Sequence, residues 1–340
     1  MKLTVAKDQR RYTALINDVG ILLEQARRKV AYEINNILVK TYWEIGRKIV
    51  LFEQQGKERA EYGANLLDKL AFDLKTKHGK GFSRDNLEKM RKFYLFFPNS
   101  ATVSRNLSWS HYCLLLRLKD ELVRTFYFKE AESQKWSVRE MDRQINSMLF
   151  ERIALSKDKA SVMQLSKRGQ IIEKAEDLIK EPYVLEFLDL EESSRYTESQ
   201  LEEKLIFHLE RFLLELGKGF TFVARQQRIT VEDEHFYVDL VFYNRLLRCF
   251  VIIELKIGKL THQDLGQLQM YVNYFDREVR SLEENPTVGI LLCADKKEAL
   301  VKYTLPTENK QIFAAKYKLY LPDKEELREK LKKVLNTQKN

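Results

Sequence analysis

The sequence predicts an α+β protein in which an all-α N-terminal domain precedes a mixed α/β domain. Three observations carry this prediction. Apolar residues recur at three- and four-residue spacing through residues 12–54 and 60–77, which is typical of amphipathic helices. Residues 220–256 hold aromatic and β-branched runs separated by polar turns, which is typical of strands. The excess positive charge is confined to residues 1–150, which carry 28 Lys and Arg against 18 Asp and Glu, while residues 151–340 carry 31 against 32.

The expected domain limits follow from this charge distribution and from local composition. We expect a basic helical domain over residues 1–155, a Lys- and Ser-rich linker over residues 156–170, and an α/β domain over residues 171–340. No run of about 20 apolar residues occurs, so no membrane contact is expected. The 3 cysteines lie far apart, which argues against a disulfide framework or structural zinc and favours the cytoplasm. No P-loop or Rossmann glycine motif is present, which argues against those enzyme classes.

The N-terminal domain contains a candidate contact for nucleic acid, because a basic surface attracts phosphate backbones. Its helices are expected over residues 12–54 (as one helix or two), 60–77, 86–94, 108–131 and 136–152. Ser83 is a good N-cap after the break at Gly79 and Gly81, so the helices on either side resemble a helix-turn-helix. The second helix would then present four basic side chains, Arg84, Lys89, Arg91 and Lys92. An αα-hairpin with a solvated basic face is the alternative, and the sequence leaves both open.

The core of the α/β domain is expected to have the element order α-β-β-β-α-β, followed by one more strand and a closing helix. A capping box of Thr197 and Gln200 begins the first helix, which reaches residue 217. Thr261 caps the helix that follows the first three strands. The expected strands cover residues 220–229, 236–243, 248–256, 287–293 and 311–320, and a charged helix closes the chain over residues 324–335.

Three charged residues interrupt the apolar strands of the central hairpin. If its turn is centred on Leu246 and Leu247, Asp239 pairs with Glu254, and Lys256 lies on the same face. Buried charges are unfavourable unless they are paired or bind a metal. A divalent cation such as Mg²⁺ is therefore one explanation, with the lysine orienting or deprotonating an attacking water. An Asp/Glu–Lys salt bridge at a sheet end is the other.

The flanking helices offer further polar groups. Glu202 falls inside the apolar stripe of the helix over residues 196–217, which makes it a third candidate carboxylate. On the helix after Thr261, Gln267 and Tyr271 are four residues apart and share a face, with Gln269 between them. These groups are either part of a site or ordinary surface residues.

Taken together, these residues resemble the PD-(D/E)XK nuclease core. The matching positions read Glu202, Asp239, Glu254-Leu255-Lys256 and Gln267-Leu268-Gln269-Met270-Tyr271. Val238 stands where a proline usually precedes the aspartate. The phrases FLLELGKGF, FYVDLVFY and VIIELKIGK are similar to the YhcG family of bacterial nucleases, as are YWEIG, LSWSHY and WSVRE in the helical part. The resemblance therefore covers nearly the whole chain.

The resemblance implies metal-dependent hydrolysis of phosphodiester bonds, in DNA rather than RNA. It implies Mg²⁺ or Mn²⁺ held by Asp239, Glu254, the Leu255 carbonyl and Glu202. Lys256 would position the attacking water, and Gln267, Gln269 and Tyr271 would support it. A homodimer would supply one site for each strand of a duplex. The alternative is a catalytically silent nucleic-acid-binding or assembly protein that uses the same fold.

Overall fold

The computed structural model describes residues 2–55, 60–100, 103–104, 106–155, 159–190 and 196–337. They form two compact units. The helical unit comprises Met1–Arg124 and Ala131–Val138, and the α/β unit comprises Thr125–Glu130 and Arg139–Asn340. Each unit is described by itself below. No helix in the described ranges combines the length and the apolar character needed to span a bilayer.

The helical unit is built on one long helix. The first predicted pattern forms a single helix, α1 (Lys2–Gln55), and its C-terminal part packs against α3 (Arg84–Phe96). Gly46 permits this close crossing, because a Cβ atom there would overlap the backbone carbonyl of Met90. The predicted cap of α3 is confirmed, since Ser83 Oγ accepts a hydrogen bond from the Asn86 N–H at 3.2 Å. The other helices are α2 (Ala60–His78), α4 (Trp109–Leu115) and α5 (Glu121–Gln134), the last shared between the units.

Two of the predicted helices are interrupted, and part of the predicted linker is helical. The pattern over 108–131 breaks because Asp120 caps a new helix, accepting from the Leu122 N–H at 2.8 Å. The pattern over 136–152 breaks at Met148, whose φ of 55° ends α6 (Val138–Asn146) before α7 (Leu149–Ala154). Residues 159–168 were expected in a linker but form α8 (Lys159–Arg168), because Val162 and Leu165 give this Lys- and Ser-rich stretch a buried face. Residues 156–158 lie outside the described ranges.

The α/β unit contains the predicted mixed sheet, and its strand order is β1-β6-β5-β4-β3-β2. Strands β2, β3 and β4 are antiparallel, whereas β4, β5, β6 and β1 run parallel. The strands are β1 (Tyr183–Val184), β2 (Phe220–Val231), β3 (Glu234–Asn244), β4 (Cys249–Lys259), β5 (Val288–Asp295) and β6 (Ile312–Lys318). The helices are α9 (Glu198–Phe207), α10 (Leu209–Leu216), α11 (His262–Tyr274), α12 (Glu298–Thr304) and α13 (Lys324–Thr337). The predicted first helix is thus divided at His208.

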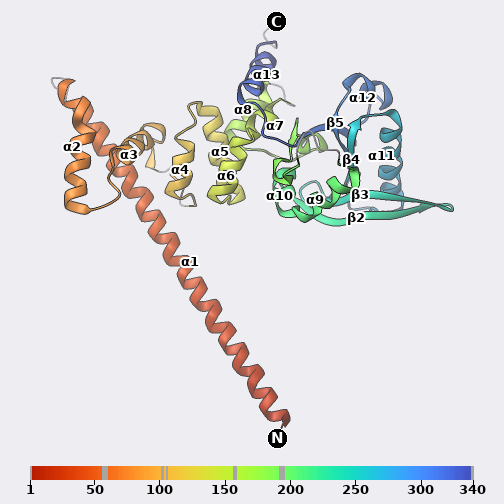
Figure 1. Cartoon of the computed structure of the whole chain (residues 1–340), viewed down its shortest axis with the longest axis horizontal. Helices are drawn as coiled ribbons and strands as arrows, with labels where there is room; N and C mark the ends of the chain where they lie inside the picture. Colours follow the sequence, from red (N-terminus) through yellow and green to blue (C-terminus); the bar gives the residue numbers. More distant parts are fainter. Residues whose placement is uncertain are drawn as a thin grey trace. The chain divides into compact units, whose positions relative to one another are not determined.

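The sheet has a core on each face. Leu201 and Leu205 of α9 and Phe212 of α10 pack against one face, while Leu265 and Leu268 of α11 pack against the other. Figure 1 shows α11 beside β4 and β5, which it contacts, and the β2–β3 hairpin extending beyond the sheet. Burial of these leucines fixes both helices to the strands that carry the candidate site.

The register of the central hairpin is the one predicted. The ladder between β3 and β4 runs from the pair Asn244 and Cys249 to the pair Leu240 and Ile253. One further step places Asp239 opposite Glu254. The ladder ends before that step, while β3 stays paired to β2 and β4 stays paired to β5. The two strands therefore separate at the charged residues.

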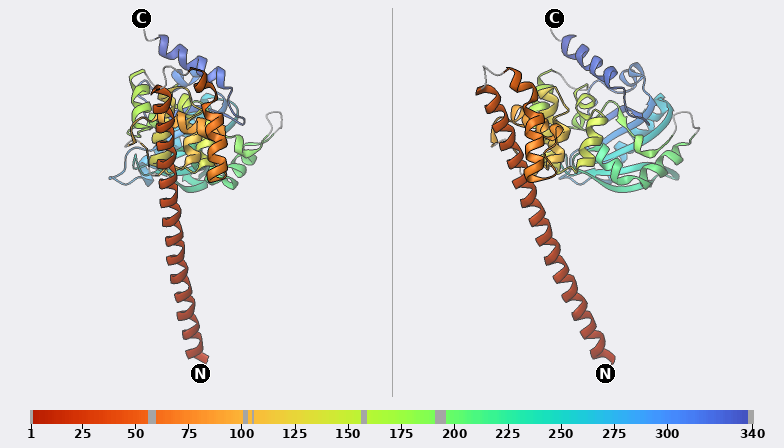
Figure 2. Two further views of the ribbon diagram at one scale, coloured as in Figure 1. Left: turned by 90° about the vertical axis from the view of Figure 1, so that its left-hand side faces the viewer. Right: turned by 60° about the vertical axis from the view of Figure 1, so that its left-hand side comes forward.

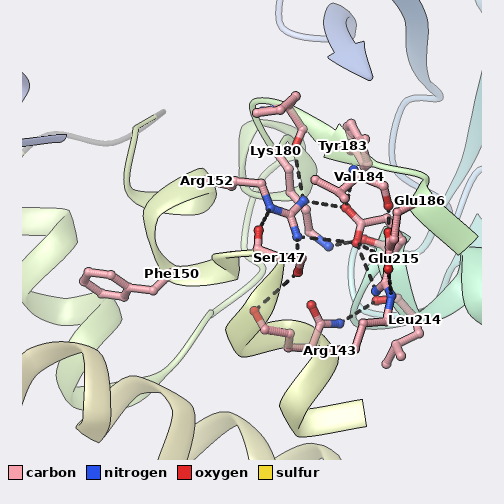
Figure 3. Close-up of polar contacts among 12 residues, drawn as sticks. Arg143, Ser147, Phe150, Arg152, Lys180, Tyr183, Val184, Glu186, Leu214 and Glu215 are labelled. Carbon is pink, nitrogen blue, oxygen red and sulfur yellow. Dashed lines mark hydrogen bonds and ion pairs between the residues drawn. The ribbon is translucent and has the colours of Figure 1, made fainter. Parts of the chain in front are cut away.

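A buried ion cluster joins four elements of the α/β unit, α6, α7, α10 and β1 (Figure 3). Glu215 of α10 is 0% exposed, and its carboxylate accepts from Arg152 of α7 at 2.5 Å and from Arg143 of α6 at 3.3 Å. The Val184 N–H donates to the same carboxylate at 3.0 Å, and Lys180 Nζ donates to the Glu215 carbonyl. Burial alone would raise the pKa of Glu215, but Arg152, Lys180 and Arg143 outweigh it and lower that pKa to about 2.

This cluster explains why the two compact units divide earlier in the chain than the expected limit at residue 155. Arg143 and Arg152 belong by sequence to the basic helical stretch. Their guanidinium groups, however, are tied to α10 and to β1. Residues from Arg139 onward consequently fold with the sheet.

Candidate active site

Two carboxylates occupy the gap where β3 and β4 separate. Asp239 Oδ2 accepts from the Leu255 N–H at 2.9 Å, and Glu254 Oε1 accepts from the Asp239 N–H at 3.0 Å. Each side chain thus binds the backbone of the opposite strand where the ladder has ended. Glu254 is only 8% exposed. Burial and then the Asp239 charge raise the pKa of Glu254 well above its ordinary value, and burial raises the pKa of Asp239.

The third predicted carboxylate, Glu202, reaches the same gap from α9. It is 4% exposed, and Gln226 of β2 bridges it to Asp239. The Gln226 amide donates to Glu202 Oε2 at 2.5 Å and to Asp239 Oδ1 at 3.0 Å. Gln226 adopts the left-handed conformation with φ of 45°, which a residue with a side chain rarely takes and which turns its amide toward the carboxylates.

The second oxygen of Glu202 has an incomplete environment. Its Oε1 atom lies 3.1 Å from Arg225 Nε, but the geometry does not form a hydrogen bond and the buried atom has no other donor. Burial raises the pKa of Glu202, although Gln226 and Arg225 partly offset this effect. Burial therefore disfavours the charged form of all three carboxyl groups, and neighbouring hydrogen-bond donors offset this only in part.

Lys256 lies beside this gap and forms ion pairs with acidic residues in the first turns of two helices. Its ammonium is 3.3 Å from Glu198 at the start of α9 and 3.3 Å from Asp264 in the first turn of α11. Asp264 is itself fixed, because its other oxygen accepts from the Thr261 hydroxyl at 2.7 Å in the predicted N-cap. Partial burial would lower the pKa of Lys256, but Glu198 and Asp264 outweigh it and raise that pKa. These two carboxylates therefore favour the protonated form of Lys256.

The three predicted site residues of α11 differ in whether hydrogen bonds connect them to the strand that carries Asp239. Tyr271 is 1% exposed, accepts from Gln267 Nε2 at 2.7 Å and donates to the Tyr237 carbonyl at 3.3 Å. This pair steadies the backbone of β3 two residues before Asp239. Gln269 instead donates to Asn273 of its own helix at 3.4 Å, so the structure does not bring it to the carboxylates.

The types of side chain in this gap suit a divalent cation, but their present positions do not form a metal site. The candidate metal ligands from side chains are all carboxylate oxygens, and the pKa values of the three carboxyl groups are raised. One oxygen of Glu202 also accepts no hydrogen bond. These are properties that a hard divalent ion would satisfy. Yet among the residues that the structure describes, no three acidic, His or Cys side chains are close enough to hold a metal. The Gln226 amide lies between Glu202 and Asp239, so a cation shared by these two carboxylates would have to displace it.

Sequence reasoning missed Gln226, Arg225 and Glu198. Glu198 could have been found, because the capping box at Thr197 places it in the first turn of the same helix as Glu202. Gln226 and Arg225 lie on a strand whose alternation gives no sign of the left-handed residue.

The predicted basic residues of α3 are mostly engaged within the helical unit. Arg84 pairs with Asp68 at 3.1 Å, Arg91 with Glu53 at 2.7 Å, and Lys92 with Glu88 at 3.4 Å, while Lys89 is exposed on the same helix. Ion pairing of this kind reduces the charge offered to a phosphate backbone. The assignment of this face to nucleic acid stays a prediction.

A mixed sheet flanked by helices, with an aspartate and a Glu-x-Lys triplet on separating strands, defines a PD-(D/E)XK-type nuclease domain. A family model described as "YhcG PDDEXK nuclease domain" matches residues 176–332, and one described as "DUF1016 N-terminal domain" matches residues 18–152. The chain is 39% identical over 352 residues to "Putative nuclease YhcG" of Escherichia coli (strain K12), which covers 94% of this chain and 93% of that protein. The chain belongs to the YhcG family of nucleases.

Solved structures match only part of the chain. A repair endonuclease from Pyrococcus abyssi is 22% identical, with a TM-score of 0.26 over 38% of this chain and 50% of that one. An EndoMS complex with double-stranded DNA is 17% identical, with a TM-score of 0.27 over 40% of this chain and 51% of that one.

Proposed function

We propose that this protein hydrolyses phosphodiester bonds in DNA with the help of a divalent cation. The observation that carries the proposal is the pair of carboxylates on separating strands, with raised pKa values and a lysine ammonium beside them. Asp239, Glu254 and the Leu255 carbonyl would hold Mg²⁺ or Mn²⁺, and Glu202 would complete the ligand set or hold a water. When bound, the cation would activate water and polarise the phosphate.

The protein's own groups would orient the reaction. Lys256 stays protonated, because Glu198 and Asp264 raise its pKa, so it would donate hydrogen bonds to the water or to a phosphate oxygen. Gln267 and Tyr271 would keep Asp239 in place through the β3 backbone. The excess of basic residues in the first 150 positions supports a polyanionic substrate.

Activity on defined substrates tests this proposal. Purified protein in Mg²⁺ or Mn²⁺ is expected to nick supercoiled plasmid, and EDTA is expected to stop the reaction. A parallel assay on RNA of similar length decides the substrate class. Binding of DNA in EDTA without cleavage in either ion would favour the alternative, a silent nucleic-acid-binding protein.

Gln226 gives a separate test of the cation site. Because its amide donates to the oxygens that a cation would need, Gln226→Ala is expected to lower the free energy of unfolding by about 1–2 kcal/mol without metal. The same change is expected to increase the rise in melting temperature on adding Mg²⁺, since a competing donor has been removed. Thermal melts with and without Mg²⁺ measure both effects.

Gln227→Ala is the matched control, because the neighbouring amide does not bond to the carboxylates in the structure as described. It should leave the Mg²⁺-induced shift unchanged. An equal Mg²⁺ shift in Gln226→Ala and the parent would show that the amide and the cation do not compete.

A further inference from the structure

The N-terminal half of α1 carries an uncovered apolar surface. Every side chain from Tyr12 to Ile34 is exposed. We call the following set the apolar stripe: Tyr12, Leu15, Ile16, Val19, Leu22, Leu23, Ala26, Val30, Ile34 and Ile37. Figure 2 shows this half of the helix extending past α2 and α3, two helices of its own unit. Contiguous apolar exposure of this kind marks an interaction surface.

The spacing within the stripe is that of a coiled-coil seam. Ile16, Leu23, Val30 and Ile37 are each seven residues apart, and Val19 and Ala26 follow three residues after the first two. Alternating steps of three and four residues place these side chains along one side of a helix. Such a repeat matches the surface of another helix rather than a sheet or a lipid face. The spacing therefore predicts a helical partner.

The helix also needs such a partner for its own stability. Its C-terminal half is secured by burial of Val39, Trp43, Ile49 and Val50. The exposed half has no comparable packing, and a helix in water gains most of its stability from a packed apolar face. A partner helix would supply that packing over the same length.

We propose that the apolar stripe pairs with the same stripe of a second copy of this chain, in antiparallel orientation. One antiparallel register brings Leu23 opposite Ala26, a large side chain against a small one, and Val30 opposite Val19. It also places Glu33 opposite Ile16, so like charges do not meet. A parallel pair would place Glu33 against Glu33 within the seam, where like charges repel. The stripe supplies ten exposed apolar side chains per copy, spread over about seven helical turns, which pairing would remove from water. A stable interface between two copies typically needs about 800 Å² from each partner, which a two-helix seam of this length can provide.

The mass of the full chain in solution tests this pairing. The parent is expected at about 81 kDa, twice the 40.4 kDa of one chain, by light scattering at micromolar concentration. Leu23→Lys with Val30→Lys places charge in the seam and is expected to give the mass of one chain. Gln25→Lys with Tyr32→Lys adds the same charge at the same spacing on the opposite side of α1, and is expected to keep the dimer.

Two results would overturn the proposal. One is a parent protein with the mass of a single chain, even if another partner covers the stripe. The other is a dimer that persists in the variant Leu23→Lys with Val30→Lys. Far-UV circular dichroism and melting temperature show whether that variant still folds in the rest of the chain. If it does not fold, the mass of the milder variant Leu23→Ala with Val30→Ala decides, with partial dissociation expected.

Cross-linking tests the orientation. A Leu23→Cys chain mixed with a larger, tagged Ala26→Cys chain is expected to form tagged–untagged disulfides on mild oxidation, with the parent as the background control for its own 3 cysteines. Cross-links mainly between identical chains would show parallel pairing and overturn the assigned orientation.

Discussion

Replacing Asp239 with Asn is expected to lower the rate of DNA cleavage in saturating Mg²⁺ by on the order of 10³-fold or more. The change removes the charge that faces Glu254 across the gap while keeping a group of the same shape. Lys256→Ala is expected to lower the rate by about 10²–10³-fold, because it removes the ammonium that Glu198 and Asp264 hold two residues after Glu254 on β4. Initial rates of plasmid nicking measure both.

Matched variants separate catalysis from folding. Lys259→Ala removes an exposed lysine from the same strand, and Asp233→Asn repeats the Asp-to-Asn change at the exposed turn between β2 and β3. Both should cut at the parent's rate. All four variants should melt within a few degrees of the parent. Parental cleavage by Asp239→Asn or by Lys256→Ala would show that the chemistry lies elsewhere.

Replacing Glu215 with Gln is expected to have the largest effect on stability, a loss of about 3–5 kcal/mol. The neutral amide would leave Arg152, Arg143 and Lys180 without the carboxylate that balances them in a buried place. Urea unfolding is expected to show a lower midpoint with an unchanged slope, because the same surface is exposed on unfolding.

Glu210→Gln is the control on the same helix, since Glu210 is exposed, and it should shift the midpoint little. The pH dependence adds a second readout. The folded pKa of Glu215, about 2, lies below the ordinary value of 4.5, so its contribution is present above about pH 4.5 and is lost as the pH falls toward 2. Glu215→Gln should lose this part of the acid dependence. An acid profile identical to the parent's would contradict the account of the cluster.

The sheet and its register could be predicted because their signals are local. The polar break after Asn244 fixes the turn, and alternation along β3 and β4 then fixes which residues face each other. The caps at Ser83, Thr197 and Thr261 are equally local, since each depends on residues within three positions. These signals were enough to bring Asp239, Glu254 and Lys256 to one place.

Features that depend on tertiary contact could not be predicted. The bridge made by Gln226 requires a left-handed residue inside a strand, which the surroundings stabilise and composition does not reveal. The Glu215 cluster joins groups that lie 63 and 72 positions apart in the chain. Helix α8 lies in a stretch whose Lys and Ser content is typical of a linker, and the burial of Val162 and Leu165 against the rest of the unit is not visible in its composition.

The most direct measurement is the anomalous diffraction of a crystal soaked in Mn²⁺. The proposed site predicts a peak between the carboxylates of Asp239 and Glu254, close to the Leu255 carbonyl, with the Gln226 amide moved aside. A Mn²⁺-soaked crystal with no peak in this gap, and with Gln226 still bridging Glu202 and Asp239, would contradict the assignment of these residues to a cation-dependent nuclease site.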